Sequence, residues 1–221
     1  LGTTRSTKSI LKGSFFDIFR FDLQGAIFIE CFGGSGSMAA EALSNGAKFA
    51  IAIEKDRDAF KILHENFDYL NADLQKKFNQ QNTSELRAIN GDTFEILEQI
   101  LEEIYAKFDE KINNKARKNL TFNSASMLAS NLTQNPSQKP NLPPIFLYID
   151  PPFHIREGQE KIYEKTLNLI KIAEKFEIDF IAIEHISSVK FDEISSNFER
   201  KKCKKFGLST LSIFQRIKNG N

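Results

Sequence analysis

The stretch IFLYIDPPF, Ile145–Phe153, joins an apolar run to an acidic, proline-rich turn. Its first five residues are β-branched, aromatic or leucine, which is typical of a strand buried in a parallel sheet. The two prolines lack N–H groups, so they cannot extend the hydrogen-bond ladder and the chain must leave the sheet. The end of the strand therefore presents a carboxylate from Asp150, rigid carbonyl groups from Pro151 and Pro152, and the ring of Phe153.

These groups suit a flat ligand that carries an amino group. The oxygens can accept hydrogen bonds from an NH₂ group while the aromatic ring stacks on the ligand's face. Taken alone, the pattern is explained equally well by a strand that ends in a proline-rich turn. Other segments of the chain are needed to decide between a ligand site and a simple turn.

Strand-like and helix-like segments alternate on both sides of this stretch. The expected strands are Gly25–Ile29, Phe49–Ile53, Arg87–Ile89, Ile145–Ile149 and Phe180–Ile183. The expected helices run from the glycine-rich turn to about Ser44, from Asp56 to about Leu70, from Thr93 to Ile104 and over residues 161–176. Phe198–Lys205 and Leu208–Ile217 predict a terminal antiparallel pair. The alternation predicts a doubly wound α/β sheet, mostly parallel, with an antiparallel C-terminal strand.

The chain length of 221 residues predicts a single domain over residues 1–221. One segment interrupts the alternation, because residues 113–144 are rich in Asn, Ser, Lys, Gln and Pro and have few apolar residues. Such a segment cannot contribute much to a core. We expect it to be a polar surface insertion before the fourth strand.

Composition narrows the class of protein. No apolar stretch approaches the roughly 18 residues needed to span a membrane, and no signal-peptide pattern begins the chain. Cys31 and Cys203 lie far apart without metal-type spacing, which favours a reduced, cytoplasmic location without a metal site. The net charge is only +1, so a nucleic acid would have to bind to local basic patches.

A second informative segment is ECFGGSG, Glu30–Gly36, which follows the first expected strand directly. Glycines let the backbone turn tightly and approach a ligand, and the N–H groups at a helix start favour polar or negative groups. We therefore expect Glu30, Phe32, Gly34 and Gly36 to contact a cofactor.

Acidic residues follow the next two strands as well. Glu54 ends the second strand, where an acid can accept hydrogen bonds from ribose hydroxyls. Asp92 follows the third strand, with Thr93 beside it, and could accept from an adenine amino group. In an open α/β sheet these turns lie side by side at the carboxyl ends of the strands. The strand ends therefore predict a site for an adenosine-containing cofactor next to Asp150.

Two cofactors compete for this site. Gly34, Gly36 and Ala39 satisfy the dinucleotide fingerprint, with Glu54 at about the expected distance, so a nicotinamide-dependent oxidoreductase remains an alternative. S-adenosylmethionine fits better, because Asp-Pro-Pro-Phe has no role in hydride transfer. A P-loop is excluded, since no Lys-Ser/Thr pair follows the glycines.

Several segments together resemble one family. Glu30–Ala47 (ECFGGSGSMAAEALSNGA) and Asp150–Phe153 are similar to the bacterial RsmD-type methyltransferases, as are Arg5–Phe19 and the tail Lys205–Phe214. The resemblance implies a Rossmann-like class I methyltransferase sheet that uses S-adenosylmethionine. It also implies methylation of the exocyclic N2 of a guanine in 16S ribosomal RNA. Glu30 departs from the family pattern, which has Asp at that position.

The resemblance also implies partners. The expected substrate is 16S rRNA or the assembling small ribosomal subunit, and Arg5, Lys8 and Lys12 are expected close to that RNA. On charge alone, these three residues could equally form a solvated helix face. We expect a cytoplasmic monomer that needs neither a membrane nor a metal.

The expected mechanism uses the motif at the end of the fourth strand. Hydrogen bonds from the guanine amino group to the Asp150 carboxylate and the Pro151 carbonyl would favour a pyramidal nitrogen, with its lone pair free to attack a methyl group. Asp150 would also stabilise the charge that develops on nitrogen, and Phe153 would stack on the base. The motif alone does not separate guanine N2 from adenine N6, so an adenine-N6 DNA methyltransferase remains an alternative.

Overall fold

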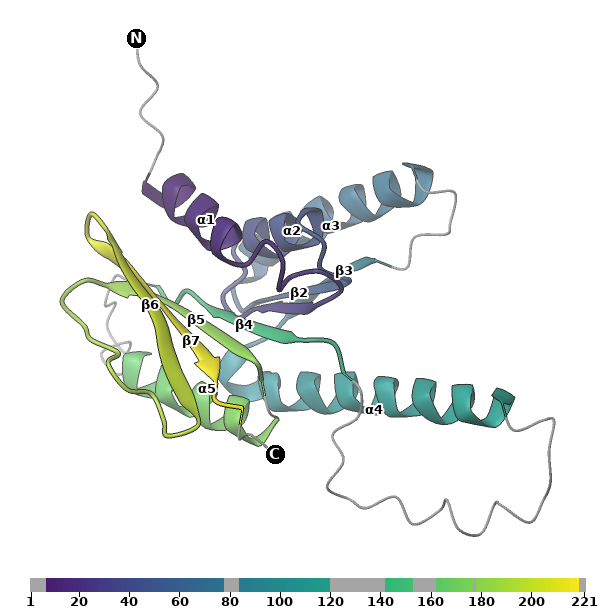
Figure 1. Cartoon of the computed structure of the whole chain (residues 1–221). Coiled ribbons are helices and arrows are strands. Elements are labelled where there is room, and N and C mark those ends of the chain that lie inside the picture. The colour runs from purple at the N-terminus through teal and green to yellow at the C-terminus, as the bar shows by residue number, and fades with distance from the viewer. Residues whose placement is uncertain (1–6, 78–83, 120–141, 153–161, 177, 219–221) are drawn as a thin grey trace. The chain divides into compact units, whose positions relative to one another are not determined.

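The computed structural model describes residues 7–77, 84–119, 142–152, 162–176 and 178–218. These residues form a seven-stranded sheet and five helices (Figure 1). The strands are β1 (Ile27–Glu30), β2 (Phe49–Glu54), β3 (Glu85–Asn90), β4 (Ile145–Ile149), β5 (Phe180–Ile186), β6 (Phe198–Phe206) and β7 (Ser209–Arg216). The helices are α1 (Thr7–Ile18), α2 (Ser37–Ser44), α3 (Arg57–Lys77), α4 (Thr93–Asn119) and α5 (Ile162–Lys175).

The strands lie in the order β3-β2-β1-β4-β5-β7-β6. Strands β1 to β5 are parallel, and β7 is antiparallel to both of its neighbours. The predicted doubly wound sheet with its antiparallel C-terminal strand is therefore confirmed. The order reverses between β1 and β4, and such a switch point leaves a crevice at the carboxyl ends of the two strands.

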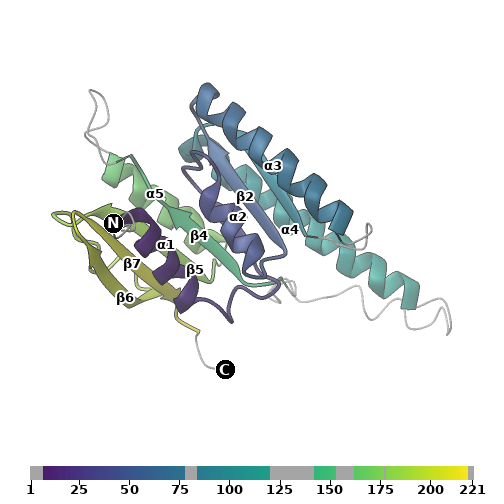
Figure 2. The ribbon, with the colours of Figure 1, turned by 90° about the horizontal axis from the view of Figure 1, so that it is seen from above.

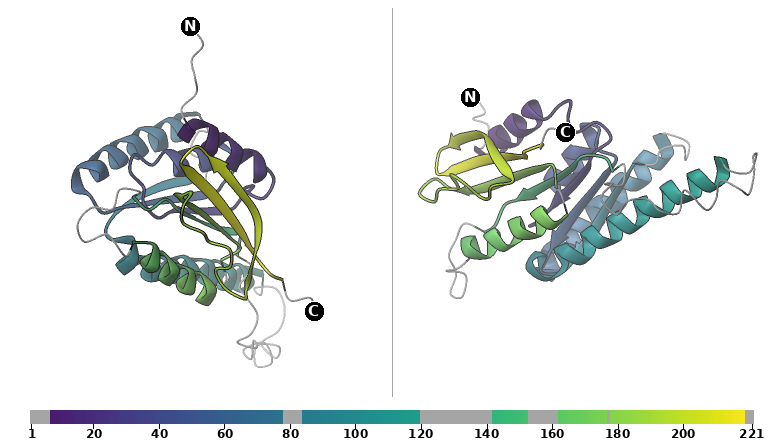
Figure 3. Two further views of the ribbon diagram at one scale, coloured as in Figure 1. Left: turned by 90° about the vertical axis from the view of Figure 1, so that its left-hand side faces the viewer. Right: turned by 60° about the horizontal axis from the view of Figure 1, so that its bottom comes forward.

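Helices cover both faces of the sheet. α1, α2 and α3 lie on one face and α5 lies on the other (Figures 1 and 2). This placement follows from right-handed crossovers, since β1 to β3 wind in one direction from the switch point and β4 to β5 in the other. Figure 3 shows β6 and β7 as a long antiparallel pair at the edge of the sheet.

The first helix is fixed to the sheet by aromatic packing. Leu11, Phe15 and Phe19 recur four residues apart and are all buried, which is the pattern of a helix with one apolar face. The Phe15 ring lies 5.9 Å from the Phe28 ring on β1 and 5.4 Å from the Tyr148 ring on β4. α1 therefore packs directly over the two strands that form the switch point.

Two helices extend further than the sequence predicts. α3 continues to Lys77 rather than to about Leu70, and α4 continues to Asn119 rather than to Ile104. Neither extension contains Gly or Pro, so no residue stops the helix. Residues 113–119 of the expected insertion are therefore helical, because a polar composition argues against core packing and not against a helix. Residues 120–141 lie outside the described part of the chain.

The chain divides into two compact units, residues 1–97 with 144–221 and residues 98–143. The first unit contains the whole sheet and every candidate site residue. The prediction of a single domain over residues 1–221 stays a prediction. None of the helices in the described ranges is long and apolar enough to cross a membrane.

Candidate functional site

A cleft of about 1380 Å³ opens at the carboxyl ends of the parallel strands. Near its end, each of the five strands contributes one acidic residue to the lining: Glu30, Glu54, Asp92, Asp150 and Glu184. The structure thus brings together the first four acids, which the sequence places here. Glu184 is the one to which the sequence gives no role.

The glycine-rich turn owes its shape to its glycines. Gly34 and Gly36 have φ angles of 51° and 77°, in the left-handed region that glycine adopts without a steric penalty. A Cβ atom on Gly36 would stand 2.3 Å from Leu63 Cδ1 and 2.4 Å from Phe67 Cε1. α3 therefore packs against the turn so closely that only glycine fits at position 36.

Glu54 is oriented by two backbone donors. Its Oε2 atom accepts a hydrogen bond from the amide of Gly34 at 2.7 Å, and its Oε1 atom accepts one from the amide of Asp56 at 2.7 Å. A carboxylate oxygen can accept more than one hydrogen bond, so the group can also accept from a ligand. The contacts fix the end of β2 to the glycine-rich turn and leave Glu54 on the cleft wall.

Glu30 is buried at the end of β1. Its Oε2 atom accepts a hydrogen bond from the amide of Ala39 at 2.9 Å, in the first turn of α2, where backbone N–H groups lack partners within the helix. Burial raises the pKa of Glu30 to about 8, although hydrogen bonds from the Ala39 and Met38 amides act in the opposite direction. Glu30 therefore holds the start of α2 against β1, in addition to lining the cleft.

Asp92 and Thr93 connect β3 and the start of α4 to their neighbours. Asp92 accepts hydrogen bonds from Lys55 Nζ at 2.7 Å and from the Phe94 amide at 3.0 Å. Burial alone would raise the pKa of Asp92, but these two donors outweigh it and the pKa is lowered. The buried Thr93 hydroxyl donates to the carbonyl of Cys31 after β1. An adenine amino group would have to share Asp92 with Lys55.

An aromatic pair lines the cleft between the turns after β1 and β3. The rings of Phe32 and Phe94 lie 5.6 Å apart in an edge-to-face arrangement, and the ammonium of Lys165 lies 5.8 Å from the Phe94 ring centre. The sequence predicts Phe32 but neither Phe94 nor Lys165. Lys165 comes from α5, and no local motif marks it.

Asp150 lies at the end of β4 with 22% of its side chain exposed. Its Oδ2 atom is 3.6 Å from Lys8 Nζ on α1. Burial, followed by the neighbouring charge of Glu184, raises the pKa of Asp150 to about 7. Pro151 is buried and Pro152 is exposed, and both line the cleft. Phe153, expected to stack on a base, lies outside the described residues.

Glu184 is the acid that the sequence leaves without a role. It is 3% exposed, and its Oε2 atom accepts a hydrogen bond from the hydroxyl of Tyr148 at 3.2 Å. Its Oε1 atom has no hydrogen-bond partner among the described residues. Burial raises the pKa of Glu184, and the charge of Lys8 opposes that shift. Its position near the end of a fifth parallel strand is the feature of the sequence that could have identified Glu184 as a site residue.

The basic residues of α1 differ in their surroundings. Lys8 is 74% exposed and lines the cleft beside Asp150. Lys12 also lines the cleft and lies 3.3 Å from Glu41 on α2. Arg5 lies outside the described residues. The structure thus brings two of the three expected RNA-contacting residues to the cleft.

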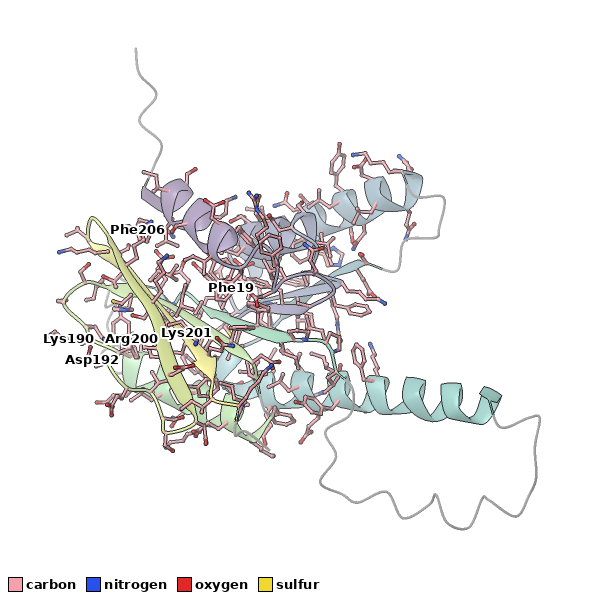
Figure 4. The ribbon with its side chains drawn as sticks, in the orientation of Figure 1. Phe19, Lys190, Asp192, Arg200, Lys201 and Phe206 are labelled. Carbon is pink, nitrogen blue, oxygen red and sulfur yellow. The ribbon has the colours of Figure 1, made fainter. Side chains whose placement is uncertain are left out.

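Other basic residues lie on the edge strand β6. Arg200 is paired with Asp192 at 2.6 Å (Figure 4), and Lys201 is paired with Glu199 at 2.7 Å. Lys204 donates to Ser14 on α1 at 3.0 Å. Charged side chains on an edge strand oppose pairing with the strands of another molecule. Their pairing within the chain favours this protective role.

Residues 2–98 match the model of the family described as conserved hypothetical protein 95. The resemblance to the RsmD-like family is confirmed. The part that matches this RsmD-like model includes α1, the glycine-rich turn, Glu54 and Asp92, whereas Asp150 lies beyond it. No curated protein matches the chain.

Solved structures of similar fold extend the comparison over nearly the whole chain. YhhF of Escherichia coli, described provisionally as a methyltransferase, is 20% identical, with 96% of this chain and 87% of that chain covered and a TM-score of 0.57. A protein of Haemophilus influenzae, described provisionally as a methylase, is 19% identical, with 96% and 100% covered and a TM-score of 0.55. A protein of Pyrococcus horikoshii, described provisionally as an RNA methyltransferase, is 14% identical, with 95% and 86% covered and a TM-score of 0.50. The chain has the class I methyltransferase fold.

Proposed function

We propose that the protein transfers a methyl group from S-adenosylmethionine to the exocyclic N2 of a guanine in 16S rRNA. One observation carries the proposal. Asp150 and Pro151 end β4 at the switch point of a class I methyltransferase sheet, in the same cleft that the glycine-rich turn lines. The resemblance to the RsmD-like family favours guanine as the base.

The residues of the cleft fit S-adenosylmethionine, which would supply a methyl group bound to a positively charged sulfur. Glu54, held by two amides, can accept from ribose hydroxyls. Phe32 and Phe94 offer aromatic surface for an adenine ring. Seven acidic and five basic side chains line the cleft, so it can meet both the positively charged sulfur and the carboxylate of this cofactor. In this proposal Glu30, Gly34, Gly36, Asp92 and Thr93 complete the cofactor site.

Asp150 acts on the amino group that receives the methyl. Its carboxylate and the Pro151 carbonyl accept hydrogen bonds from the two N–H groups, which frees the nitrogen lone pair for the new N–C bond. As that bond forms, the bond from the methyl carbon to sulfur breaks, and the nitrogen releases one proton. Asp150 can take this proton near neutral pH because its pKa is about 7. Pro152 fixes the turn, and Phe153 stacks on the base.

We assign the approach of the RNA to α1. Lys8 is exposed and lies next to Asp150, so its ammonium can meet a phosphate close to the nucleotide in the cleft. Lys12 and Arg5 extend the same basic segment. Because the chain has a net charge of only +1, such a local patch would account for RNA binding better than the overall charge. A monomer in the cytoplasm remains the expected form.

An adenine-N6 DNA methyltransferase is the second candidate, because Asp150, Pro151 and Pro152 would hold an adenine amino group in the same way. A nicotinamide-dependent oxidoreductase is less favoured, since hydride transfer gives these residues no role. The test is to incubate the protein with labelled S-adenosylmethionine and either DNA or small ribosomal subunits that lack the modification. Mass analysis of the nucleosides should show N2-methylguanosine from the subunits. N6-methyladenine, or no transfer, would contradict the proposal.

A further inference from the structure

Among the residues that the structure describes, one oxygen of Glu184 has no hydrogen-bond partner. Glu184 is 3% exposed and lines the cleft, and its Oε1 atom has no hydrogen-bond partner among the described residues. Glu54, by contrast, uses both oxygens to accept from backbone amides. Leaving a buried acceptor unsatisfied is unfavourable, because the group has lost its hydrogen bonds to water. A cost of this kind beside a cleft points to a ligand that supplies the missing donor.

The backbone places Glu184 next to Asp150. Ile149 on β4 and Ile183 on β5 are register partners in parallel strands, so the residues that follow them stand at the same level. Neighbouring strands lie about 4.8 Å apart. The hydroxyl of Tyr148 holds the Oε2 atom of Glu184 and so limits how the carboxyl can turn. Two carboxyl groups therefore stand side by side near the point where the base would react.

We propose that Glu184 accepts the N1–H group of the target guanine while Asp150 accepts from its N2 amino group. This inference rests on the proposed function and adds a specificity-determining residue to it. Guanine carries two neighbouring donors on its Watson–Crick edge, N1–H and N2–H₂. Adenine carries only the N6 amino donor, next to N1, which is an acceptor. The charge of Lys8 and the hydroxyls of Tyr148 and Ser209 favour the ionised form of Glu184 against the effect of burial. In that form the carboxylate only accepts hydrogen bonds, so it favours guanine and repels adenine N1.

The experiment compares two bases that differ at N1. Guanine and 2-aminopurine both carry the exocyclic 2-amino group, but 2-aminopurine lacks the N1–H and also the 6-oxo oxygen, so the Glu184 variants are needed to assign a preference to N1–H. Substrate RNA carries one or the other at the position that the wild-type protein methylates. The wild-type protein should prefer guanine by roughly a hundredfold in kcat/KM, which corresponds to the loss of one hydrogen bond to a charged group.

Glu184→Gln and Glu184→Ala should lose most of the activity on guanine and keep that on 2-aminopurine, so the preference should shrink to a few-fold. Glu199→Gln on the edge strand β6 is the matched control, because its carboxylate pairs with Lys201 outside the cleft. It should keep both activities and the preference. Calorimetry with S-adenosylmethionine should give the same affinity for all variants, which shows that the cleft is intact.

The possible results distinguish failure of the proposed function from failure of the inference about Glu184 alone. Wild-type protein that forms no N2-methylguanosine contradicts the proposed function, and this inference with it. Wild-type protein that methylates guanine and 2-aminopurine equally well contradicts the inference alone, and this comparison needs no folded variant. Glu184 variants that lose equal activity on guanine and on 2-aminopurine would also overturn the inference, because Glu184 would then act through Asp150 rather than on N1–H.

Discussion

The ammonium of Lys8 lies 3.6 Å from the carboxylate of Asp150, so the first helix reaches the end of the fourth strand. The contact joins a residue expected to meet RNA with the residue expected to hold the reacting amino group. It also places a positive charge beside a carboxyl whose pKa is raised by burial. The protonation of Asp150 therefore depends on α1 as well as on its own strand.

The pH dependence of activity should reveal this link. The carboxylate form of Asp150 is the one that accepts hydrogen bonds, and the pKa is about 7, so kcat/KM should rise with pH through about 7 and then level off. Lys8→Gln removes a charge that lowers the pKa of Asp150, so the rise should move up by about one pH unit. The measurement is kcat/KM for methyl transfer from about pH 5 to about pH 9. Lys77→Gln, at the far end of α3, is the control, and identical curves for all three proteins would rule out the link.

Glu30 should make the protein less stable as the pH rises. Its folded-state pKa of about 8 is above the ordinary value of 4.5, so the protonated form is favoured by folding. That contribution is complete below about pH 4.5 and is lost as the pH rises through about 8. Denaturant unfolding of the wild type should show the loss, roughly 5 kcal/mol from this residue. Glu30→Gln should flatten the dependence, although Asp150 and Glu184 contribute in the same direction.

The control for that measurement is Glu65→Gln, on the exposed surface of α3. It should leave the pH dependence of the unfolding free energy as it is in the wild type. A steep dependence that persists in Glu30→Gln would show that the burial of Glu30 does not govern this behaviour.

Two Gly→Ala substitutions should have opposite effects on stability. Gly36→Ala introduces a Cβ atom 2.3 Å from Leu63 at a φ of 77°, so it should lower the free energy of unfolding by about 2–4 kcal/mol. Gly13→Ala, in the exposed part of α1, brings a Cβ atom that meets no atom of the described residues within 4 Å. It should stabilise the helix by about 0.5–1 kcal/mol. Urea unfolding measures both, and a neutral Gly36→Ala would contradict the close packing of α3 against the turn.

The fold could be predicted because its signals are local. Runs such as Phe49–Ile53 and Ile145–Ile149 are long enough to fill a buried parallel strand, and Asn45-Gly46 ends the helix that precedes Phe49. The order of the elements along the chain then limits the topology, because crossovers are right-handed. The predicted ends of α3 and α4 were wrong, because the residues that follow Leu70 and Ile104 within these helices include no Gly or Pro.

Residues of the site could be predicted from local sequence where they lie at or just after the end of a strand. Glu54 and Asp92 satisfy that condition, and the structure places both on the cleft wall. The contact between Lys8 and Asp150 depends on how α1 packs on the sheet, which no spacing in the sequence reveals. Lys165 reaches Phe94 from α5 for the same reason. Glu184 is near a strand end, but only its burial and an oxygen without a partner among the described residues distinguish it from an ordinary acid.

Asp150→Ala tests the central claim most directly. If Asp150 holds the amino group and the other strand ends hold the cofactor, the substitution should reduce methyl transfer by at least about a hundredfold. Calorimetry on the same preparation should give an affinity for S-adenosylmethionine close to that of the wild type. Loss of both properties together would assign Asp150 a structural role, and retained methyl transfer would contradict the account.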